Sequence, residues 1–199
     1  DRPDGTQIAA NLVIGGFSTE FKGIEFEGSA AVSENLTMDW SLNYADAEFK
    51  NFDCGFTDDY YAPDATGRLS CDGNAPVQFP NKSGAIAATW NDSFTADWDY
   101  FVRWDVSYKS KRYADEANFA YVGSQVLSNL RIGFTKDDLR LEGFVTNLFN
   151  DKAWLAGGRW TDFSADRGGL FPFEFTAQQG LALTAPKLRQ FGVRASYNF

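Results

Sequence analysis

Histidine is absent from the sequence, and cysteine and methionine are scarce, with two Cys and one Met among 199 residues. Without histidine the chain cannot form a Ser–His–Asp triad, a histidine general base or a histidine metal site. Asp58 and Asp59 could bind Ca²⁺ through carboxylate oxygens, but we interpret them as solvated loop charge. We therefore expect a protein that is not an enzyme and that carries no cofactor and no metal ion.

Positive charge is also in short supply, because 18 Lys and Arg face 27 Asp and Glu and give a formal net charge of −9. Surfaces that bind nucleic acid carry an excess of Lys and Arg. The largest basic cluster is "KSKR" at 109–112. Nucleic acid is therefore not an expected partner.

Long apolar runs are missing too, and none approaches the roughly 18 residues that a membrane-spanning helix needs. This excludes a helical membrane protein but not a membrane β-barrel. The strands of a barrel alternate apolar and polar residues, so an averaged hydropathy does not detect them. The first residues, "DRPDGTQ", contain neither the charged nor the apolar region of a signal peptide. We expect a mature protein or an internal fragment.

Aromatic residues are abundant at 17%, and apolar residues repeat with a period of two. In the last eleven residues, "RQFGVRASYNF", every second residue is Phe, Val, Ala or Tyr, as in a strand with one apolar face. The same alternation predicts seven strands. They are 23–32, 36–44, 83–90, 95–109, 126–135, 139–146 and 187–199.

The connections between these strands alternate in length. Short polar turns are predicted at 33–35, 91–94 and 136–138, and long loops at 51–81, 110–120 and 149–185. In an antiparallel meander all short turns then lie at one end and all long loops at the other. Outer-membrane barrels have this asymmetry, with short periplasmic turns and long extracellular loops.

The two faces of the predicted strands differ in polarity. Trp98, Val102, Trp104 and Val193 belong to the apolar set, which we expect to face lipid, with its Trp and Tyr residues in interfacial girdles. The opposite set is charged and would line a wet lumen. It contains Glu25, Glu27, Asp97, Asp99, Arg103, Asp105, Arg131, Arg140 and Glu142. The pattern alone also fits a soluble β-sandwich with an apolar interior.

Cys54 and Cys71 lie in one polar segment rich in Asp and Gly. An even number, a short separation and a loop setting favour a disulfide in an oxidising compartment. We predict that the two cysteines are bridged to each other in an extracellular loop. Two free thiols in a cytosolic protein are the alternative.

Four segments resemble the late barrel strands of TonB-dependent outer-membrane receptors, and together the resemblance covers about 17–199. They are "FKGIEFEGSAAVSENLTMDWSLNYADAEF" at 21–49, "FPNKSGAIAATW" at 79–90, "GFVTNLFNDKAW" at 143–154 and "APKLRQFGVRASYNF" at 185–199. The third resembles the family's Asn-Leu-Phe-Asp-Lys signature. Here Asn150 is inserted before Asp151, which we interpret as loop variation.

The resemblance implies an all-β fold, an antiparallel up-and-down transmembrane β-barrel. Residues 1–199 would be the C-terminal portion, about seven strands of a 22-stranded barrel, without the plug domain and the earlier strands. It also implies that the final strand, with Phe191, Val193, Tyr197 and the terminal Phe199, is the signal read by the barrel assembly machinery. Strands 23–32 and 187–199 should then lie at the two edges of an open sheet.

The function implied by the resemblance is energised uptake of a scarce nutrient across the bacterial outer membrane, without covalent chemistry. The ligand is a small molecule, a ferric siderophore or an oligosaccharide. Partners are the TonB energising complex, acting through the absent plug, the assembly machinery, lipid and lipopolysaccharide. Two alternatives stay open: a small structural or adhesive outer-membrane barrel and a secreted carbohydrate-binding β-sandwich.

Candidate ligand-binding residues lie in the predicted long loops. Exposed Trp and Tyr could stack on sugar rings or aromatic chelators, and Arg could pair with anionic groups. These aromatic residues could instead pack on one another at the barrel mouth. The candidates are Tyr60, Tyr61, Arg68, Tyr113, Trp154, Arg159, Trp160, Phe163 and Arg167.

Overall fold

The computed structural model describes residues 18–54, 70–162 and 178–198, and within these ranges it contains strands and turns but no helix. Accordingly, the described part of the chain has no helix long and apolar enough to cross a membrane. The side chains of residues 161–162 and 178–179 are not described. The fold is all-β, as predicted.

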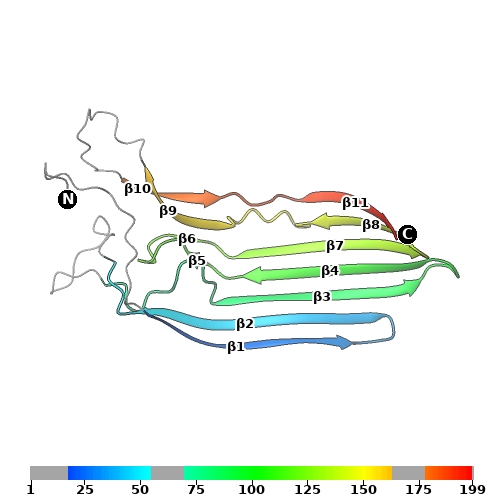
Figure 1. Ribbon diagram of the computed structural model, residues 1–199, viewed down its shortest axis with the longest axis horizontal. Helices are drawn as coiled ribbons and strands as arrows, with labels where there is room; N and C mark the ends of the chain where they lie inside the picture. Colours follow the sequence, from blue (N-terminus) through cyan, green and yellow to red (C-terminus); the bar gives the residue numbers. More distant parts are fainter. Residues whose placement is uncertain (1–17, 55–69, 163–177, 199) are drawn as a thin grey trace.

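The largest element is a seven-stranded sheet in which neighbouring strands are antiparallel, in the order β1-β2-β3-β4-β7-β8-β11 (Figure 1). Strands β1 and β11 are its two edges, so they do not pair with each other, as expected. The strands are β1 (Ser18–Ala31), β2 (Leu36–Lys50), β3 (Lys82–Ser93), β4 (Asp99–Lys109), β7 (Gln125–Lys136), β8 (Leu139–Thr146) and β11 (Gln190–Tyr197).

Short turns lie at one end of the sheet and long connections at the other, which confirms the predicted asymmetry (Figure 1). The β1–β2 turn is closed by hydrogen bonds from the backbone N–H of Val32 and Ser33 to the Leu36 carbonyl, at 2.8 and 3.3 Å. Asp137, in the two-residue β7–β8 turn, has a φ of 47°. Asp tolerates this left-handed conformation better than most residues.

The turn between β3 and β4 differs from the prediction. Strand β3 extends to Ser93, and β4 begins at Asp99 rather than at 95. The N–H groups of Phe94 and Thr95 both donate to the Trp98 carbonyl, at 2.7 and 3.2 Å, so residues 94–98 form the turn. Asp97 and Trp98 are therefore turn residues, although the alternation of polar and apolar residues continues through them.

Two predicted loops contain additional strands. The connection 110–120 contributes β5 (Arg112–Tyr113), which pairs with β6 (Tyr121–Val122). The connection 149–185 contains β9 (Ala156–Asp162), which pairs with β10 (Gln178–Thr184). Gly157 and Gly158 interrupt the alternation in β9 and weaken the sequence signal of a strand.

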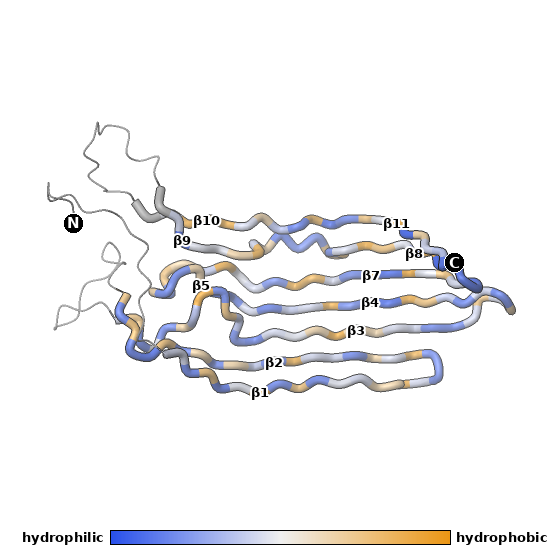
Figure 2. The backbone as a smooth tube through the Cα atoms, in the orientation of Figure 1, coloured by the Kyte–Doolittle hydropathy of each residue, from blue (hydrophilic) through white to orange (hydrophobic). Residues whose placement is uncertain are grey.

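The register of the sheet keeps apolar residues opposite apolar residues. Ile24 pairs with Tyr44, and Trp104 pairs with Leu130. Large side chains on this face remain exposed, with Ile24 at 75% and Val193 at 90% of their accessible area. Figure 2 shows the alternation of hydrophobic and hydrophilic residues along the strands.

The opposite, polar face carries hydrogen bonds and ion pairs between side chains of different strands. The Ser29 hydroxyl on β1 donates to Asp39 on β2 at 2.7 Å, and Arg103 on β4 lies 3.1 Å from the same carboxylate. Farther along the sheet, Arg131 on β7 lies 3.3 Å from Asp105 on β4. The polar face is thus cross-linked by side chains as well as by the backbone.

Aromatic rings on the polar face lie over glycines of the next strand. Phe101 on β4 is opposite Gly133 on β7, and Phe144 on β8 is opposite Gly192 on β11. A Cβ atom added to either glycine would collide with the ring of its partner. Glycine therefore allows each ring to lie flat against the neighbouring strand.

Arginines cover both rings and share one carboxylate. The guanidinium of Arg140 lies 4.5 Å from the Phe101 centroid, and that of Arg194 lies 5.8 Å from the Phe144 centroid. Glu142 is 3.1 Å from Arg140 and 3.6 Å from Arg194, and its side chain is only 5% exposed. Glu142 therefore links β8 to β11 beneath two cations.

Candidate ligand-binding site at the loop end

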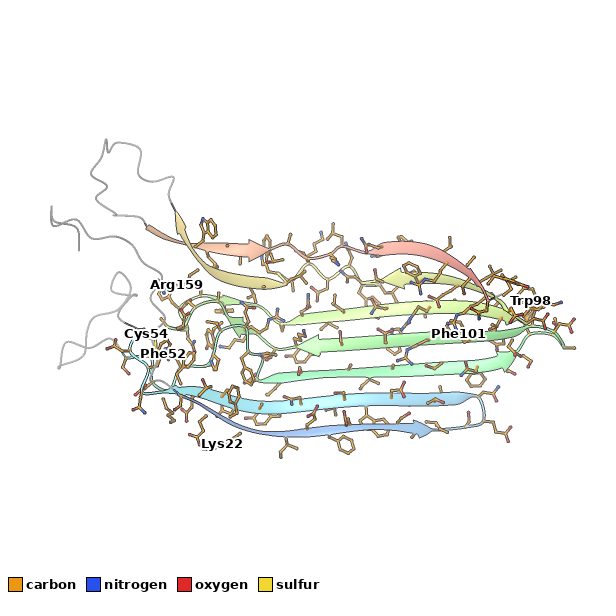
Figure 3. All side chains as sticks on the ribbon, viewed as in Figure 1. Lys22, Phe52, Cys54, Trp98, Phe101 and Arg159 are labelled. Carbon is orange, nitrogen blue, oxygen red and sulfur yellow. A yellow bond between two sulfur atoms is a disulfide. The ribbon has the colours of Figure 1, made fainter. Side chains whose placement is uncertain are left out.

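The predicted disulfide is present and lies at the loop end of β2, near Phe52 in Figure 3. Cys54 and Cys71 are bonded, with Cα atoms 5.8 Å apart. They are buried together with Phe49, Phe52 and Ala117. The N–H of Cys71 donates to the Phe52 carbonyl at 2.8 Å, so the chain returns along β2. Closing a loop of this length contributes on the order of 3 kcal/mol.

A compact hairpin lies beside this disulfide. Asp115 is buried and its carboxylate accepts the N–H groups of Phe119 and Ala120, at 3.0 and 2.7 Å. Asn118 forms two hydrogen bonds with Ala75, both of 2.8 Å, one through its amide oxygen and one through its amide nitrogen. These contacts fix β5–β6 against the segment that follows Cys71.

The hairpin presents a cation between two aromatic rings, which we call the Lys111 cluster (Lys111, Tyr113 and Tyr121). Lys111 Nζ donates to the Tyr113 hydroxyl at 2.9 Å and lies 4.7 and 5.5 Å from the Tyr113 and Tyr121 ring centroids. The hydrogen bond to Tyr113 raises the pKa of Lys111 above its usual range. The ammonium is therefore charged at neutral pH, and Lys111 is exposed at the loop end of the sheet.

The second hairpin contacts the first through small residues. A Cβ atom at Gly157 would lie 3.1 Å from side-chain atoms of both Ala114 and Val122, so glycine allows β9 to approach β5–β6 closely. Gln78 donates its side-chain amide to the Gly157 carbonyl. Arg112 is buried and donates to the Trp154 carbonyl at 3.4 Å.

An ion pair completes the contact between the hairpins. Arg159 Nη1 on β9 lies 3.8 Å from the Glu116 carboxylate in the β5–β6 turn. The structure therefore places the predicted residues Tyr113 and Arg159 in two hairpins that contact each other, and Trp154 directly before the second hairpin. The predicted residue Trp160 is on β9 and is 61% exposed.

Other predicted site residues lie outside the described residues. They are Tyr60, Tyr61, Arg68, Phe163 and Arg167. Sequence reasoning missed Lys111 and Tyr121 as site candidates. A signal for Lys111 was present, because it lies two positions before the candidate Tyr113 in an extended segment, and residues two positions apart share a face of a strand. Among residues 18–54, 70–162 and 178–198, no cluster of carboxylates or cysteines could hold a metal ion.

Comparison with known proteins identifies the family. Residues 3–148 match the family described as TonB dependent receptor-like, beta-barrel. The chain belongs to this family. No curated protein matches the sequence.

Solved structures of TonB-dependent receptors share the fold of this chain. The ferric yersiniabactin uptake receptor FyuA from Yersinia pestis superposes on 91% of the chain with a TM-score of 0.66 and 15% identity. BauA, the ferric preacinetobactin receptor from Acinetobacter baumannii, covers 91% with a TM-score of 0.61 and 19% identity. The siderophore receptor PiuA from Acinetobacter baumannii covers 89% with a TM-score of 0.61 and 16% identity. The chain spans 24%, 22% and 21% of these proteins.

The Asn-Leu-Phe signature of this TonB-dependent receptor chain forms a hydrogen-bonded junction. Asn147 is 4% exposed and has a φ of 51°. Its amide oxygen accepts the N–H of Asp151 at 2.8 Å, and its amide nitrogen donates to the carbonyls of Asp151 and Lys187, both at 2.9 Å. The residue thereby connects the end of β8 to the segment before β11.

The junction also reaches β7. Asp151 accepts the N–H of Val126 at 2.7 Å through one carboxylate oxygen and that of Ala153 at 2.7 Å through the other. The inserted residue, Asn150, has a φ of 56° and accepts the N–H of Arg189 at 3.0 Å. The insertion is therefore accommodated by a left-handed turn that adds a hydrogen bond to the junction.

The last strand carries the predicted assembly signal. Phe191, Val193 and Tyr197 on β11 lie on the apolar face and are exposed, and Phe199 lies outside the described residues. Their recognition by the assembly machinery stays a prediction.

Proposed function

We propose that this chain is the C-terminal part of the barrel of a receptor that imports a ferric siderophore across the bacterial outer membrane. The family match over residues 3–148 carries the proposal. The two-faced sheet supports it, since one face is apolar and exposed and the other is charged. The apolar face contacts lipid, and the polar face lines the lumen.

The arrangement of strands also supports a larger barrel. A small, self-contained barrel would need β1 and β11 to pair, but they are the two edges of the sheet. A sandwich would need a second large sheet, whereas the other sheets among the described residues have two strands each. The remaining strands and the plug, which we expect to receive energy from TonB, belong to the rest of the complete receptor.

The Lys111 cluster offers a chemical basis for binding at the loop end. Ferric siderophores often carry negative charge and aromatic rings, which an ammonium and two Tyr rings can contact. Of the three similar structures, one is a ferric yersiniabactin uptake receptor, one is a ferric preacinetobactin receptor and one is a siderophore receptor. A siderophore is thus the substrate class that we favour.

An oligosaccharide is the second candidate. Trp154 and Trp160 are exposed at the loop end, at 44% and 61%. Exposed indole rings can stack on sugar rings, and this observation favours a carbohydrate ligand.

The test uses the complete receptor expressed in cells that lack other iron-uptake receptors. Uptake of radioactive iron is measured with a panel of ferric siderophores, and oligosaccharide uptake is measured in parallel. We expect energy-dependent iron uptake with at least one siderophore. Lys111→Gln should weaken siderophore binding several-fold, because it removes the cation between the rings.

Lys109→Gln is the matched control, since Lys109 is a nearby exposed lysine at the end of β4. It should leave binding unchanged. Uptake of an oligosaccharide without uptake of any ferric siderophore would contradict the proposed substrate class. If both lysine variants weaken binding equally, the Lys111 cluster is not part of the binding site.

A further inference from the structure

The apolar face contains a groove of about 570 Å³ toward the loop end of the sheet. Strand β3 lies between β2 and β4 and contributes Gly84 and Ile86 to the lining. The neighbouring strands contribute Leu42 and Tyr44 from β2 and Tyr108 from β4. The groove therefore runs along β3, between the larger side chains of the two strands beside it.

Gly84 gives the groove its depth. It is directly opposite Leu42 on one side and Tyr108 on the other, and these two side chains are 46% and 40% exposed. A Cβ atom at Gly84 would lie only 2.8 Å from Cδ2 of Leu42. The missing side chain thus leaves a depression between two ridges, which an extended hydrocarbon chain can follow.

Lys82 places a cation at the mouth of the groove. It is the first residue of β3, and its ammonium lies 6.0 Å from the ring centroid of Tyr44. Ser110 fixes the backbone of this residue, because its hydroxyl accepts the Lys82 N–H at 3.1 Å and its own N–H donates to the Lys82 carbonyl at 2.8 Å. Among the described residues, no carboxylate lines the groove.

Two other lysines on this face near the loop end differ from Lys82 in their partners. Lys22 lies 2.5 Å from the Glu20 carboxylate, and Lys50 lies 2.7 Å from that of Glu48. Lys82 forms no ion pair with a carboxylate in the described part of the chain. Its charge is therefore free to pair with an anion from outside the sheet.

The order of these residues along β3 matches the order of chemical groups in a membrane lipid of the outer leaflet. Tyrosine favours the boundary between headgroups and hydrocarbon, and Tyr44 lies beside Lys82 at this level. Ile86 lies about 13 Å from Lys82 along the strand, in the direction of the bilayer centre. A lipid with an anionic headgroup could therefore place its charge at Lys82 and one hydrocarbon chain along the groove.

We propose that this groove is a specific binding site for lipopolysaccharide, with one lipid A phosphate at Lys82 and one acyl chain along Gly84 and Ile86. The site rests on the membrane orientation in the proposed function, but not on the imported ligand. Lipopolysaccharide forms the outer leaflet of the outer membrane, and its lipid A joins phosphates to acyl chains. An ammonium binds a phosphate as a point charge, so this site selects a headgroup, whereas the rest of the apolar face only needs hydrocarbon.

The experiment titrates the purified complete receptor, freed of bound lipid in detergent, with diphosphoryl lipid A and measures binding by native mass spectrometry. We expect saturable binding that weakens roughly fivefold in Lys82→Gln, through the loss of a charge-assisted contact. Ile86→Trp should also weaken binding, because the larger side chain fills the groove. Circular dichroism confirms that each variant is folded, and either variant alone suffices for the test.

Lys22→Gln is the matched control. Lys22, labelled in Figure 3, lies on the same face but is paired with Glu20 and is outside the lining of the groove. The control should bind lipid A like the wild type. Lipid A without phosphates is the second probe, and it should bind more weakly than diphosphoryl lipid A and equally to the wild type and Lys82→Gln.

Three results would overturn the site: wild-type affinity for lipid A in the folded variants of Lys82 and Ile86, equal losses in Lys82→Gln and Lys22→Gln, or equal binding of lipid A with and without phosphates. Iron uptake by Lys82→Gln should equal that of the wild type, since the groove faces lipid rather than the lumen. A wild-type receptor that binds lipid A as expected but imports no ferric siderophore would overturn the transport proposal and leave the lipid site intact.

Discussion

The two faces of the seven-stranded sheet follow from one alternating pattern but are held in different ways. The apolar face consists of large exposed side chains such as Ile24 and Val193. The polar face is joined by pairs such as Asp39–Arg103 and by rings that lie on glycine. The stability of the apolar face depends on the solvent that surrounds it. The polar face is instead stabilised by hydrogen bonds and ion pairs between particular residues.

This difference has a consequence for substitutions. On the apolar face many hydrophobic side chains should be interchangeable, but a charge should be costly at every position within the membrane. On the polar face a charge should be tolerated, but the loss of one partner should leave another polar group unsatisfied. The following predictions compare the two faces.

The largest effect is expected for a charge on the apolar face. Val102 pairs with Trp90 and Ile132 in the middle of the sheet. Val102→Arg should destabilise the complete receptor by about 2–4 kcal/mol, since the guanidinium would lie near the bilayer midplane. Denaturant-induced unfolding in lipid vesicles measures the change.

Ser41→Arg is the control on the polar face, where Ser41 is opposite Glu27. It should cost much less, because the new cation meets water and a carboxylate. If both variants lose the same stability, the two faces do not differ in solvent and the membrane orientation is wrong.

A smaller effect is expected when a methyl group is added beneath a ring. Gly133→Ala places a Cβ atom against the Phe101 ring and should cost about 1–3 kcal/mol through overpacking. Gly143→Ala adds the same group on the apolar face, where nothing lies within 4 Å. Gly143→Ala should be neutral in the same unfolding assay, and a similar cost at both sites would contradict the proposed role of Gly133.

The shared carboxylate of the polar face provides a third comparison. Glu142→Gln retains the shape of the side chain but removes the charge between Arg140 and Arg194. Both arginines are at least half exposed, so solvent screens the loss and we expect a cost of about 1–2 kcal/mol. The variant should unfold with a reduced dependence on salt. A stability equal to that of the wild type would show that the pairs are incidental.

The smallest effect is expected at the edge strand. Ser29→Ala removes one hydrogen bond to Asp39, which keeps its contact with Arg103. The expected cost is about 0.5 kcal/mol, at the low end for a hydrogen bond. Ala31→Ser, on the same face of β1, is a control that adds a hydroxyl; a larger loss in this control would contradict the assignment.

Alternation in the sequence predicted the sheet well, because each residue of a strand has a fixed side. All seven strands and the alternation of short and long connections were predicted, and so was the Cys54–Cys71 disulfide. The start of β4 was misplaced, since Trp98 fits the alternation but its carbonyl closes a turn. The types of the residues do not reveal backbone hydrogen bonds of this kind.

The loop end was less predictable, because its contacts join segments that are distant in sequence. Gly157 reads as a strand breaker, yet it permits β9 to lie against Ala114 and Val122. Tyr113 was predicted as a candidate for its residue type. Its partner Tyr121 was not, because only the pairing of β5 with β6 brings the two rings together.

The rings that lie on glycine also settle an ambiguity that alternation leaves behind. If β7 slid by two residues along β4, every side chain would keep its face, yet Phe101 would meet Arg131 or Thr135, and both carry a Cβ atom. A similar slide of β11 would bring Gln190 or Arg194 opposite Phe144. The alternation with period two therefore specifies which face of the sheet each side chain occupies. The glycines beneath the rings specify the register of each strand against its neighbour.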